Sequence, residues 1–320
     1  MSLRIGFIGT GGIAGHHLRT LAQLPDATLA AFCDVVPSKA RAAADTYGGK
    51  AYGDFRQMFD SEHLDAVYIC LPPFAHGEPE LEALGRGLPI FVEKPVATTA
   101  DAADQIQAAI EEAGLISAVG YHWRYMDLTA RARERLAGQE VGFALGSWAG
   151  GMPGVSWWRV MEQSGGQIVE QTTHIFDLAR YLLGEVRSVH AACRTGLMKE
   201  VEHYNVHDAT VTNLSFASGA IASITSACML GTGGHVGLDL YLKDQVLRLD
   251  HRYLTVEKSE GKEIFYLGNN PTFDEDAAFL KAVQSGDPSG IRCPYAEAVK
   301  TLKLTLAATR SASENRVINL

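Results

Sequence analysis

Three polar residues recur along one predicted helix in the segment GGQIVEQTTHIFDLARYLL. Glu170, His174 and Asp177 have the spacing i, i+4, i+7, which places them on one face of a helix predicted over 165–183. A neutral histidine suits a general base, because its pKa lies near the working pH. The apolar residues occupy the opposite arc, so periodicity alone leaves open whether the polar row meets water or a substrate.

A lysine follows a predicted strand in the segment FVEKPVA, where Glu93 and Lys94 end the apolar run. Ligands of parallel sheets bind outside the carboxyl ends of the strands, so Lys94 is expected to face a ligand. An ammonium group beside a reacting oxygen stabilises developing alkoxide character. Lys94 and His174 would then form a complementary pair, a cation that polarises an oxygen and a proton acceptor, with Glu170 bonding a substrate hydroxyl or tuning His174. The plainer interpretation is a surface lysine and a surface histidine paired with Asp177.

No metal is expected beside Glu170, His174 and Asp177, although carboxylates and imidazoles do bind metals. No further histidine or cysteine stands nearby at the spacing of metal ligands. A lysine that polarises the substrate oxygen also makes a Lewis acid redundant. Asp177 is expected to support the site rather than to contact the substrate.

A glycine-rich turn separates the first predicted strand from the first predicted helix in RIGFIGTGGIAGHHL. Its pattern is G-x-G-x-x-A, which in this context permits a tight turn, close approach of a pyrophosphate and close helix packing. The helix N-terminus adds backbone N–H groups and a positive dipole end. Residues predicted to bind a dinucleotide here are Gly9, Thr10, Gly11, Gly12 and Ile13. The following His16 and His17 are expected on the helix surface.

An acidic residue, Asp34, ends the second predicted strand about 20 residues further on, as the dinucleotide fingerprint requires. Its carboxylate is expected to accept hydrogen bonds from the ribose hydroxyls and to repel a 2′-phosphate, which favours NAD over NADP. Ser38, Lys39 and Arg41 follow closely and offer a site for that phosphate if Asp34 turns away, so NADP stays possible. The alternative is that these three residues form a solvated helix face.

The order of predicted helices and strands differs between the first 120 residues and the rest of the chain. Over 1–120 short apolar strands alternate with helices, which predicts a doubly wound parallel sheet of the α/β class. Over 121–320 two helices, at Met126–Leu136 and 165–183, precede strands that follow one another without long helices. Two helices close the chain, near Asp274–Ser285 and Tyr295–Ala312. The second domain is therefore expected to be α+β with an antiparallel sheet.

Composition limits the class of protein. The chain has 320 residues, a formal net charge of −9, 47% hydrophobic and 20% charged residues, which indicates a soluble globular protein of two domains. The acidic balance argues against nucleic-acid binding and provides no basic patch for a membrane. There is no run of about 20 apolar residues and no signal-peptide pattern. Five scattered cysteines without a CxxC pair indicate reduced, buried cysteines and a cytoplasmic location.

Taken together, these motifs give the chain a family resemblance. The glycine turn, the EKP motif, VGYHWRY, GGQIVEQTTHIFDLARYLLG and the closing SASENRVINL cover essentially the whole chain. With them the chain resembles the glucose–fructose oxidoreductase, inositol dehydrogenase and rhizopine-catabolism (Gfo/Idh/MocA) family of NAD(P)-dependent oxidoreductases. The resemblance implies a Rossmann domain followed by a domain with an open, mostly antiparallel sheet that serves for oligomer contact. A homo-oligomer, dimer or tetramer, is therefore expected.

The resemblance also implies a reaction, hydride transfer between nicotinamide and a secondary alcohol of a sugar, inositol or similar polyol. It implies that Lys94 lies close to the substrate hydroxyl and that His174 is the general acid/base. Members often have aspartate where this chain has Glu170, which weakens any transfer of their substrate preference. Two alternatives stay open. One is a non-catalytic dinucleotide-binding sensor or regulatory protein, and the other is an enzyme acting on a non-sugar ring such as a dihydrodiol.

Further candidates come from the strand ends and from the aromatic segments. Leu71 and Pro72 end the strand before the EKP motif, and His76 resembles a cofactor-side histidine of the family or is an early helix residue. The segment GYHWRYMD borders the nicotinamide and the substrate in the family. It supplies His122 for the substrate and Arg124 for the cofactor, with a buried interdomain ion pair as the alternative for Arg124. In GVSWWRVMEQ, aromatic faces beside a cation suit a polyol. The residues proposed there are Trp158 and Arg159, and a core aromatic pair is the alternative.

Overall fold

The first strand of the chain, β1 (Leu3–Ile8), is a central strand of a six-stranded parallel sheet in the computed structural model, which describes residues 2–320. The sheet order is β3 (Lys50–Tyr52), β2 (Ala27–Cys33), β1, β4 (Ala66–Ile69), β5 (Ile90–Val92) and β6 (Ser117–Val119). The order runs outward in both directions from β1, which is the topology of a doubly wound sheet. The predicted α/β class is confirmed, and the carboxyl ends of β1, β4 and β5 meet at one edge.

Helices connect these strands in the right order for βαβ units. They are α1 (Gly12–Leu21), α2 (Pro37–Tyr47), α3 (Phe55–Ser61), α4 (Glu78–Gly85) and α5 (Ala100–Ala113), with the 3-10 turns η1 (Pro73–Ala75) and η2 (His122–Tyr125). Local signals fix their starts, because Pro37 occupies the first turn of α2 and the Thr99 hydroxyl accepts a hydrogen bond from Ala102 N at 3.3 Å.

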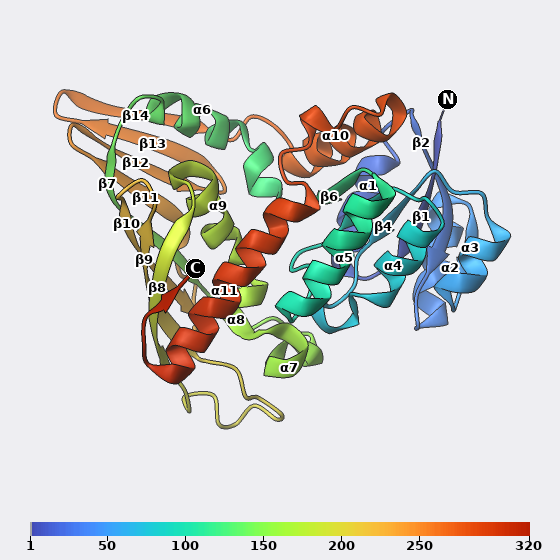
Figure 1. Cartoon of the computed structure of the whole chain (residues 1–320), viewed down its shortest axis with the longest axis horizontal. Helices are drawn as coiled ribbons and strands as arrows, with labels where there is room; N and C mark the ends of the chain where they lie inside the picture. The colour runs from blue at the N-terminus through green and yellow to red at the C-terminus, as the bar shows by residue number, and fades with distance from the viewer. Residues whose placement is uncertain (1) are drawn as a thin grey trace. The chain divides into compact units, whose positions relative to one another are not determined.

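The chain divides into two compact units. Unit 1 comprises the residues up to Tyr125 together with Asn270–Val299, and unit 2 comprises Met126–Asn269 with Lys300–Leu320. The expected domain division at residue 120/121 stays a prediction, and it did not include the return of 270–299 to unit 1. That return has a packing cause. The helix α10 (Pro271–Ser285), orange-red in Figure 1, buries Phe279 edge-on against the rings of Tyr68 and Phe91.

Unit 2 contains a nine-stranded sheet in which only β7 and β10 pair in parallel, so it is mostly antiparallel as predicted. Alternate residues of β9 are buried and exposed, which leaves one face of the strand open. The order is β14 (Gly261–Tyr266), β13 (Tyr253–Lys258), β12 (Gln245–Asp250), β11 (Val236–Leu242), β7 (Val141–Ala149), β10 (Ile221–Ala227), β9 (Ala209–Phe216), β8 (Val186–Arg194) and β15 (Ile318–Asn319). Its helices include α6 (Asp127–Leu136), and α11 (Tyr295–Glu314) ends in this unit.

The central strand β7 was not predicted. Two glycines, Gly142 and Gly146, interrupt its hydrophobic pattern and weaken the strand signal. The structure explains Gly146, because a Cβ atom there would lie 2.7 Å from Ile175 Cγ2. The missing side chain lets the helix α9 (Thr173–Leu183), which carries Ile175, approach β7 closely (Figure 1).

The single helix predicted over 165–183 is wrong. The chain forms α7 (Met161–Ser164), α8 (Gly166–Glu170) and α9 (Thr173–Leu183) instead. Gly165 and Gly166 both have positive φ, and they separate α7 from α8. The N–H groups of Gln171 and Thr172 both donate to Gln167 O, where the chain turns between α8 and α9. Glu170 therefore ends one helix, and His174 stands in the first turn of the next.

Two expectations about exposure are also wrong. His17 is fully buried, whereas its neighbour His16 is exposed as predicted. Cys193 is exposed, whereas the other four cysteines are buried, and all five are free. Among the helices of residues 2–320, none is long and apolar enough to cross a membrane.

Candidate active site

The glycine-rich turn has the geometry that its sequence predicts. Gly9 has φ +85° and its N–H donates to Cys33 O at 2.8 Å, and an added Cβ atom would lie 2.3 Å from Cys70 O. No other residue type fits this position without moving β4. Around Gly11 and Gly12, by contrast, an added Cβ atom would meet no described atom within 4 Å. Open space at the start of α1, where no described side chain caps the helix, suits a pyrophosphate.

Asp34 is bonded directly to this turn. Its Oδ2 accepts hydrogen bonds from Thr10 N and Thr10 Oγ1, both at 3.0 Å, and its Oδ1 accepts one from Val36 N at 2.9 Å. The carboxylate thus ties the end of β2 to the turn after β1. Because a carboxylate offers about four acceptor positions, Asp34 retains capacity for ribose hydroxyls. Sequence reasoning assigned Asp34 to the ribose but did not foresee its bond to Thr10.

The other strand ends bring further predicted residues to the same edge of unit 1. Leu71 and Pro72 follow β4, and Glu93 and Lys94 follow β5. The Glu93 carboxylate is 4% exposed, and its Oε2 accepts a hydrogen bond from Lys94 N at 3.0 Å. The Lys94 side chain is half-buried at this edge. Within unit 1 the structure therefore brings together the glycine turn and the EKP motif.

His76 lies at the start of α4 and is bonded to that helix. Its Nδ1 lies 2.5 Å from Glu80 Oε1, and Glu80 Oε2 accepts a hydrogen bond from Gly77 N at 2.7 Å. The side chains of His76 and Glu80 are fully buried. These contacts stabilise the first turn of α4, so His76 contributes to the structure of unit 1. Its contact with a cofactor stays a prediction.

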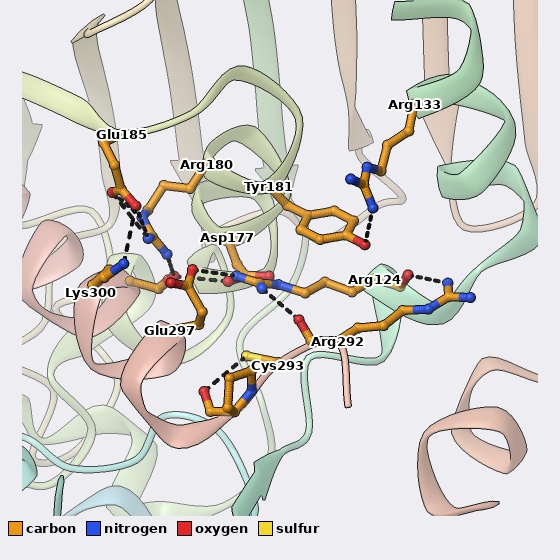
Figure 2. Close-up of polar contacts among 12 residues, drawn as sticks. Arg124, Arg133, Asp177, Arg180, Tyr181, Glu185, Arg292, Cys293, Glu297 and Lys300 are labelled. Carbon is orange, nitrogen blue, oxygen red and sulfur yellow. Dashed lines mark hydrogen bonds and ion pairs between the residues drawn. The ribbon is translucent and has the colours of Figure 1, made fainter. Parts of the chain in front are cut away.

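The turn η2 carries His122 and Arg124. Burial lowers the pKa of His122 to about 4, so its imidazole is neutral at neutral pH. The Arg124 guanidinium is buried and donates to Arg292 O at 2.8 Å, with Glu297 Oε2 at 3.8 Å (Figure 2). Arg292 Nη1 in turn donates to Arg124 O at 2.7 Å. Arg124 thus pairs with the partly exposed Glu297 inside unit 1, and its contact with a cofactor stays a prediction.

In unit 2, His174 is 5% exposed, and its ring stacks on Trp148 of β7 with 5.5 Å between centroids. Asp177, one turn further along α9, is buried and accepts a hydrogen bond from Thr301 Oγ1 at 2.8 Å. Arg180 Nη1 donates to the same hydroxyl, and its other nitrogens bind Glu185 (Figure 2). The polar side chains of α9 therefore do not form a solvent-exposed face. Asp177 joins α9 to α11, which agrees with a supporting task.

Glu170 is bonded to an aromatic residue that was predicted to touch the substrate. Trp158, in the turn η3 (Ser156–Arg159), has no exposed surface, and its Nε1 donates to Glu170 Oε2 at 2.8 Å. Arg159 is half-buried in the same turn. The structure thus brings Trp158 and Glu170 together, and their contact with a substrate stays a prediction.

A residue that sequence reasoning missed, Asn205, holds this turn in place. Asn205 N donates to Arg159 O at 3.0 Å, Asn205 Oδ1 accepts from Met161 N at 2.6 Å, and Asn205 Nδ2 donates to Glu162 Oε2 at 3.2 Å. The sequence around Asn205 carries no motif, so these hydrogen bonds could be found only from the fold. Trp148 was missed in the same way, because its strand was not predicted.

Comparison with known proteins identifies the family. Residues 3–121 match the model of an oxidoreductase family with an NAD-binding Rossmann fold, and residues 130–245 match the GFO/IDH/MocA C-terminal domain. The D-glucoside 3-dehydrogenase of Escherichia coli (strain K12) is 30% identical and aligns over 68% of each chain. The chain belongs to the Gfo/Idh/MocA family. The predicted family resemblance is thereby confirmed.

Other members of the Gfo/Idh/MocA family align over nearly the full length. The myo-inositol 2-dehydrogenase of Thermotoga maritima is 26% identical over 99% of this chain and 98% of its own. A levoglucosan dehydrogenase solved in complex with NADH superposes with a TM-score of 0.89 at 20% identity, over 100% of this chain and 99% of that one, and so shares the fold. This Gfo/Idh/MocA chain is accordingly an NAD-binding oxidoreductase with a small-molecule substrate.

Proposed function

We propose that the chain oxidises a secondary hydroxyl of a sugar, inositol or similar polyol, with NAD as hydride acceptor. Lys94 polarises the substrate oxygen, and His174 is the acid/base. The observation that carries the proposal is the position of Lys94. It directly follows β5 at the edge where the glycine turn follows β1, and Glu93 holds its backbone there. Ligands of such sheets bind at this edge.

The residues of unit 1 fit the cofactor. The uncapped start of α1 and the space around Gly11 and Gly12 suit the pyrophosphate, and Asp34 suits the adenosine ribose. When bound, NAD supplies the hydride acceptor that no side chain can provide. Leu71, Pro72 and His76 belong to the same unit and are proposed to line the cofactor site.

The chain's own residues then handle the proton and the developing charge. A neutral His174 imidazole accepts the proton of the substrate hydroxyl, since the ordinary pKa of histidine lies near 6.5. The Lys94 ammonium stabilises the alkoxide character that develops on the same oxygen. Glu170 and Arg159 are proposed to bind other hydroxyls, with Trp158 fixing Glu170 through its indole N–H. His122 remains neutral and is proposed to contact the substrate.

The function is tested by binding and turnover measured separately. Titration of NAD and NADP against protein fluorescence measures cofactor binding, and a panel of polyols and sugars followed at the NADH absorbance band measures oxidation. We expect NAD binding and turnover of at least one polyol that is abolished in Lys94→Ala. NAD binding without turnover of any substrate, unchanged by Lys94→Ala, would instead support a dinucleotide-binding sensor.

Asp34→Ala is expected to reduce the preference for NAD over NADP. The substitution removes the negative charge that repels a 2′-phosphate and the acceptor for the ribose hydroxyls. NAD affinity is expected to fall about tenfold or more, since a hydrogen bond to a charged group contributes about 1.5–3 kcal/mol. The measurement is the ratio of Kd values for NAD and NADP.

Thr10→Val is the matched control for Asp34→Ala. It removes the 3.0 Å hydrogen bond from Thr10 Oγ1 to Asp34 but keeps the carboxylate. NAD binding should weaken while the NAD/NADP ratio stays as in the wild type. A mutant Asp34→Ala that still rejects NADP as strongly as the wild type would show that other residues decide cofactor choice.

We also propose that the open face of the sheet in unit 2 joins copies of the chain into a homo-oligomer. Exposed apolar side chains lie on this face, with Phe143 paired opposite Ile221 and Leu145 two residues along β7. Light scattering should give a mass of at least twice 34.5 kDa, and Ile221→Lys should shift it toward the monomer. A monomeric wild type would refute the proposal.

The free cysteines support a cytoplasmic location.

A further inference from the structure

A histidine that the proposed reaction does not use lies buried beside the EKP motif. His17 of α1 has no exposed surface. Its Nε2 lies 2.9 Å from Glu93 Oε1 at the end of β5, and its Nδ1 lies 2.8 Å from Asp276 Oδ1 on α10. The ring thus bridges two carboxyl groups from segments that are about 180 residues apart in the chain. Its edge packs on Phe91, with 4.9 Å between centroids.

The carboxylate that binds His17 also binds the backbone of Lys94. Glu93 Oε1 forms the hydrogen bond with His17 Nε2, and Glu93 Oε2 accepts the hydrogen bond from Lys94 N at 3.0 Å. Gly120, which follows β6, provides the necessary space, because an added Cβ atom there would lie 2.4 Å from Glu93 Oε1. A change in the position of the Glu93 carboxylate therefore also moves the backbone of Lys94.

The charges around His17 favour its protonated form. Burial alone would lower the pKa of His17, but Asp276 and Glu93 outweigh burial and raise that pKa well above its usual value. Burial raises the pKa of Glu275 on α10 well above its ordinary value, which disfavours the charged form of this neighbour. The remaining titratable neighbours are Tyr68 and Cys70, whose pKa values burial raises, and His122, whose pKa burial lowers. The two carboxyl groups therefore favour the protonated form of His17, in which both ring nitrogens donate hydrogen bonds.

We propose that His17 is a positioning residue for Lys94: anchored by Asp276, its imidazolium holds the Glu93 carboxylate, which fixes the backbone of Lys94. The inference rests on the proposed function of Lys94. It also gives α10 a part in the active site, because α10 supplies Asp276. Ligand atoms of His17, Glu93 and Glu275 lie within 4.8 Å of one another, close enough for a metal ion. An ordinary N–H···O hydrogen bond explains the 2.9 Å contact between His17 and Glu93 without a metal ion.

The test compares His17→Gln and Asp276→Asn with His16→Gln, an exposed neighbour on the same helix. We expect kcat to fall by up to about 10²-fold in the first two variants, since a displacement of about 1 Å near the chemistry has this effect. The Kd for NAD should change little, whereas the thermal midpoint should fall, because removing one partner of a buried ion pair leaves a buried charge unpaired. His16→Gln should match the wild type in all three measurements.

A second readout needs no cofactor. In the cofactor-free protein labelled with ¹⁵N-histidine, His17 should stay doubly protonated through neutral pH, because Asp276 and Glu93 raise its pKa. Asp276→Asn should lower the pH at which His17 titrates. A neutral His17 in the wild type would overturn the proposal, and so would a stoichiometric metal ion in the purified protein.

Three kinetic outcomes separate this proposal from the proposed function. Full kcat in folded His17→Gln and Asp276→Asn, with Lys94→Ala inactive, would refute only the positioning of Lys94. Full kcat in Lys94→Ala would refute the proposed function itself. A loss of NAD affinity as large as the loss of kcat in both network variants would show a general structural task and would also overturn the positioning proposal.

Discussion

Replacing His174 by alanine is expected to lower kcat by about 10²-fold or more, which is the usual scale for the loss of a general base. The wild type should lose alcohol oxidation as the pH falls, because a protonated imidazole cannot accept the hydroxyl proton. His174→Ala should lack this acidic limb in its profile of kcat against pH. The fold should survive, because the ring packs on Trp148 at one edge of α9 and a smaller side chain causes no clash.

His251→Ala is the control for this experiment. His251 is exposed in the turn between β12 and β13 of the same unit, so its removal should leave kcat and the pH profile unchanged. An acidic limb that persists in His174→Ala would remove His174 from the mechanism, whatever the size of the fall in kcat. The NAD affinity of both variants should equal that of the wild type.

Lys94→Ala is expected to lower kcat by about 10²–10³-fold, the effect of deleting one preorganised donor to a developing oxyanion. Lys94→Arg should rescue little of this loss, because a planar guanidinium cannot replace a compact ammonium group at a half-buried strand end. The Kd for NAD should change much less than kcat. Steady-state kinetics and fluorescence titration measure the two effects.

Lys281→Ala provides the matched control, since Lys281 is exposed on α10 of the same unit. It removes the same charge from the chain without touching the strand ends, so kcat should be that of the wild type. If Lys94→Ala lowered kcat only as far as Lys281→Ala does, the ammonium of Lys94 would have no part in the chemistry.

The parallel sheet could be predicted because its signals are local. The glycine turn, Pro37 at the start of α2 and Thr99 at the start of α5 each act within a few residues, and all three stand at the starts of helices in the structure. The strand β7 could not be predicted in this way. Gly146 serves the approach of a helix about 30 residues further along, and a contact of that kind leaves no pattern near the strand itself.

The site was predictable in its residue types but not in its contacts. The spacing of Glu170 and His174 suggested one helix, yet the chain turns at Gln171 and Thr172 between them, and Trp158 rather than helix geometry holds Glu170. His17 shows the same limit. Its burial depends on Asp276, which lies 259 residues away, so the adjacent pair of histidines looked like a helix surface. Periodicity describes one element, whereas these contacts depend on how several elements pack.

The central claim is that Lys94 and His174 act on the same hydroxyl group. The most direct test is a crystal structure of the chain with NAD and a polyol that it oxidises. The account predicts that Lys94 Nζ and a ring nitrogen of His174 both lie within about 2.6–3.2 Å of one substrate oxygen, whose carbon faces the nicotinamide. A bound polyol whose reacting hydroxyl contacts neither residue would contradict it.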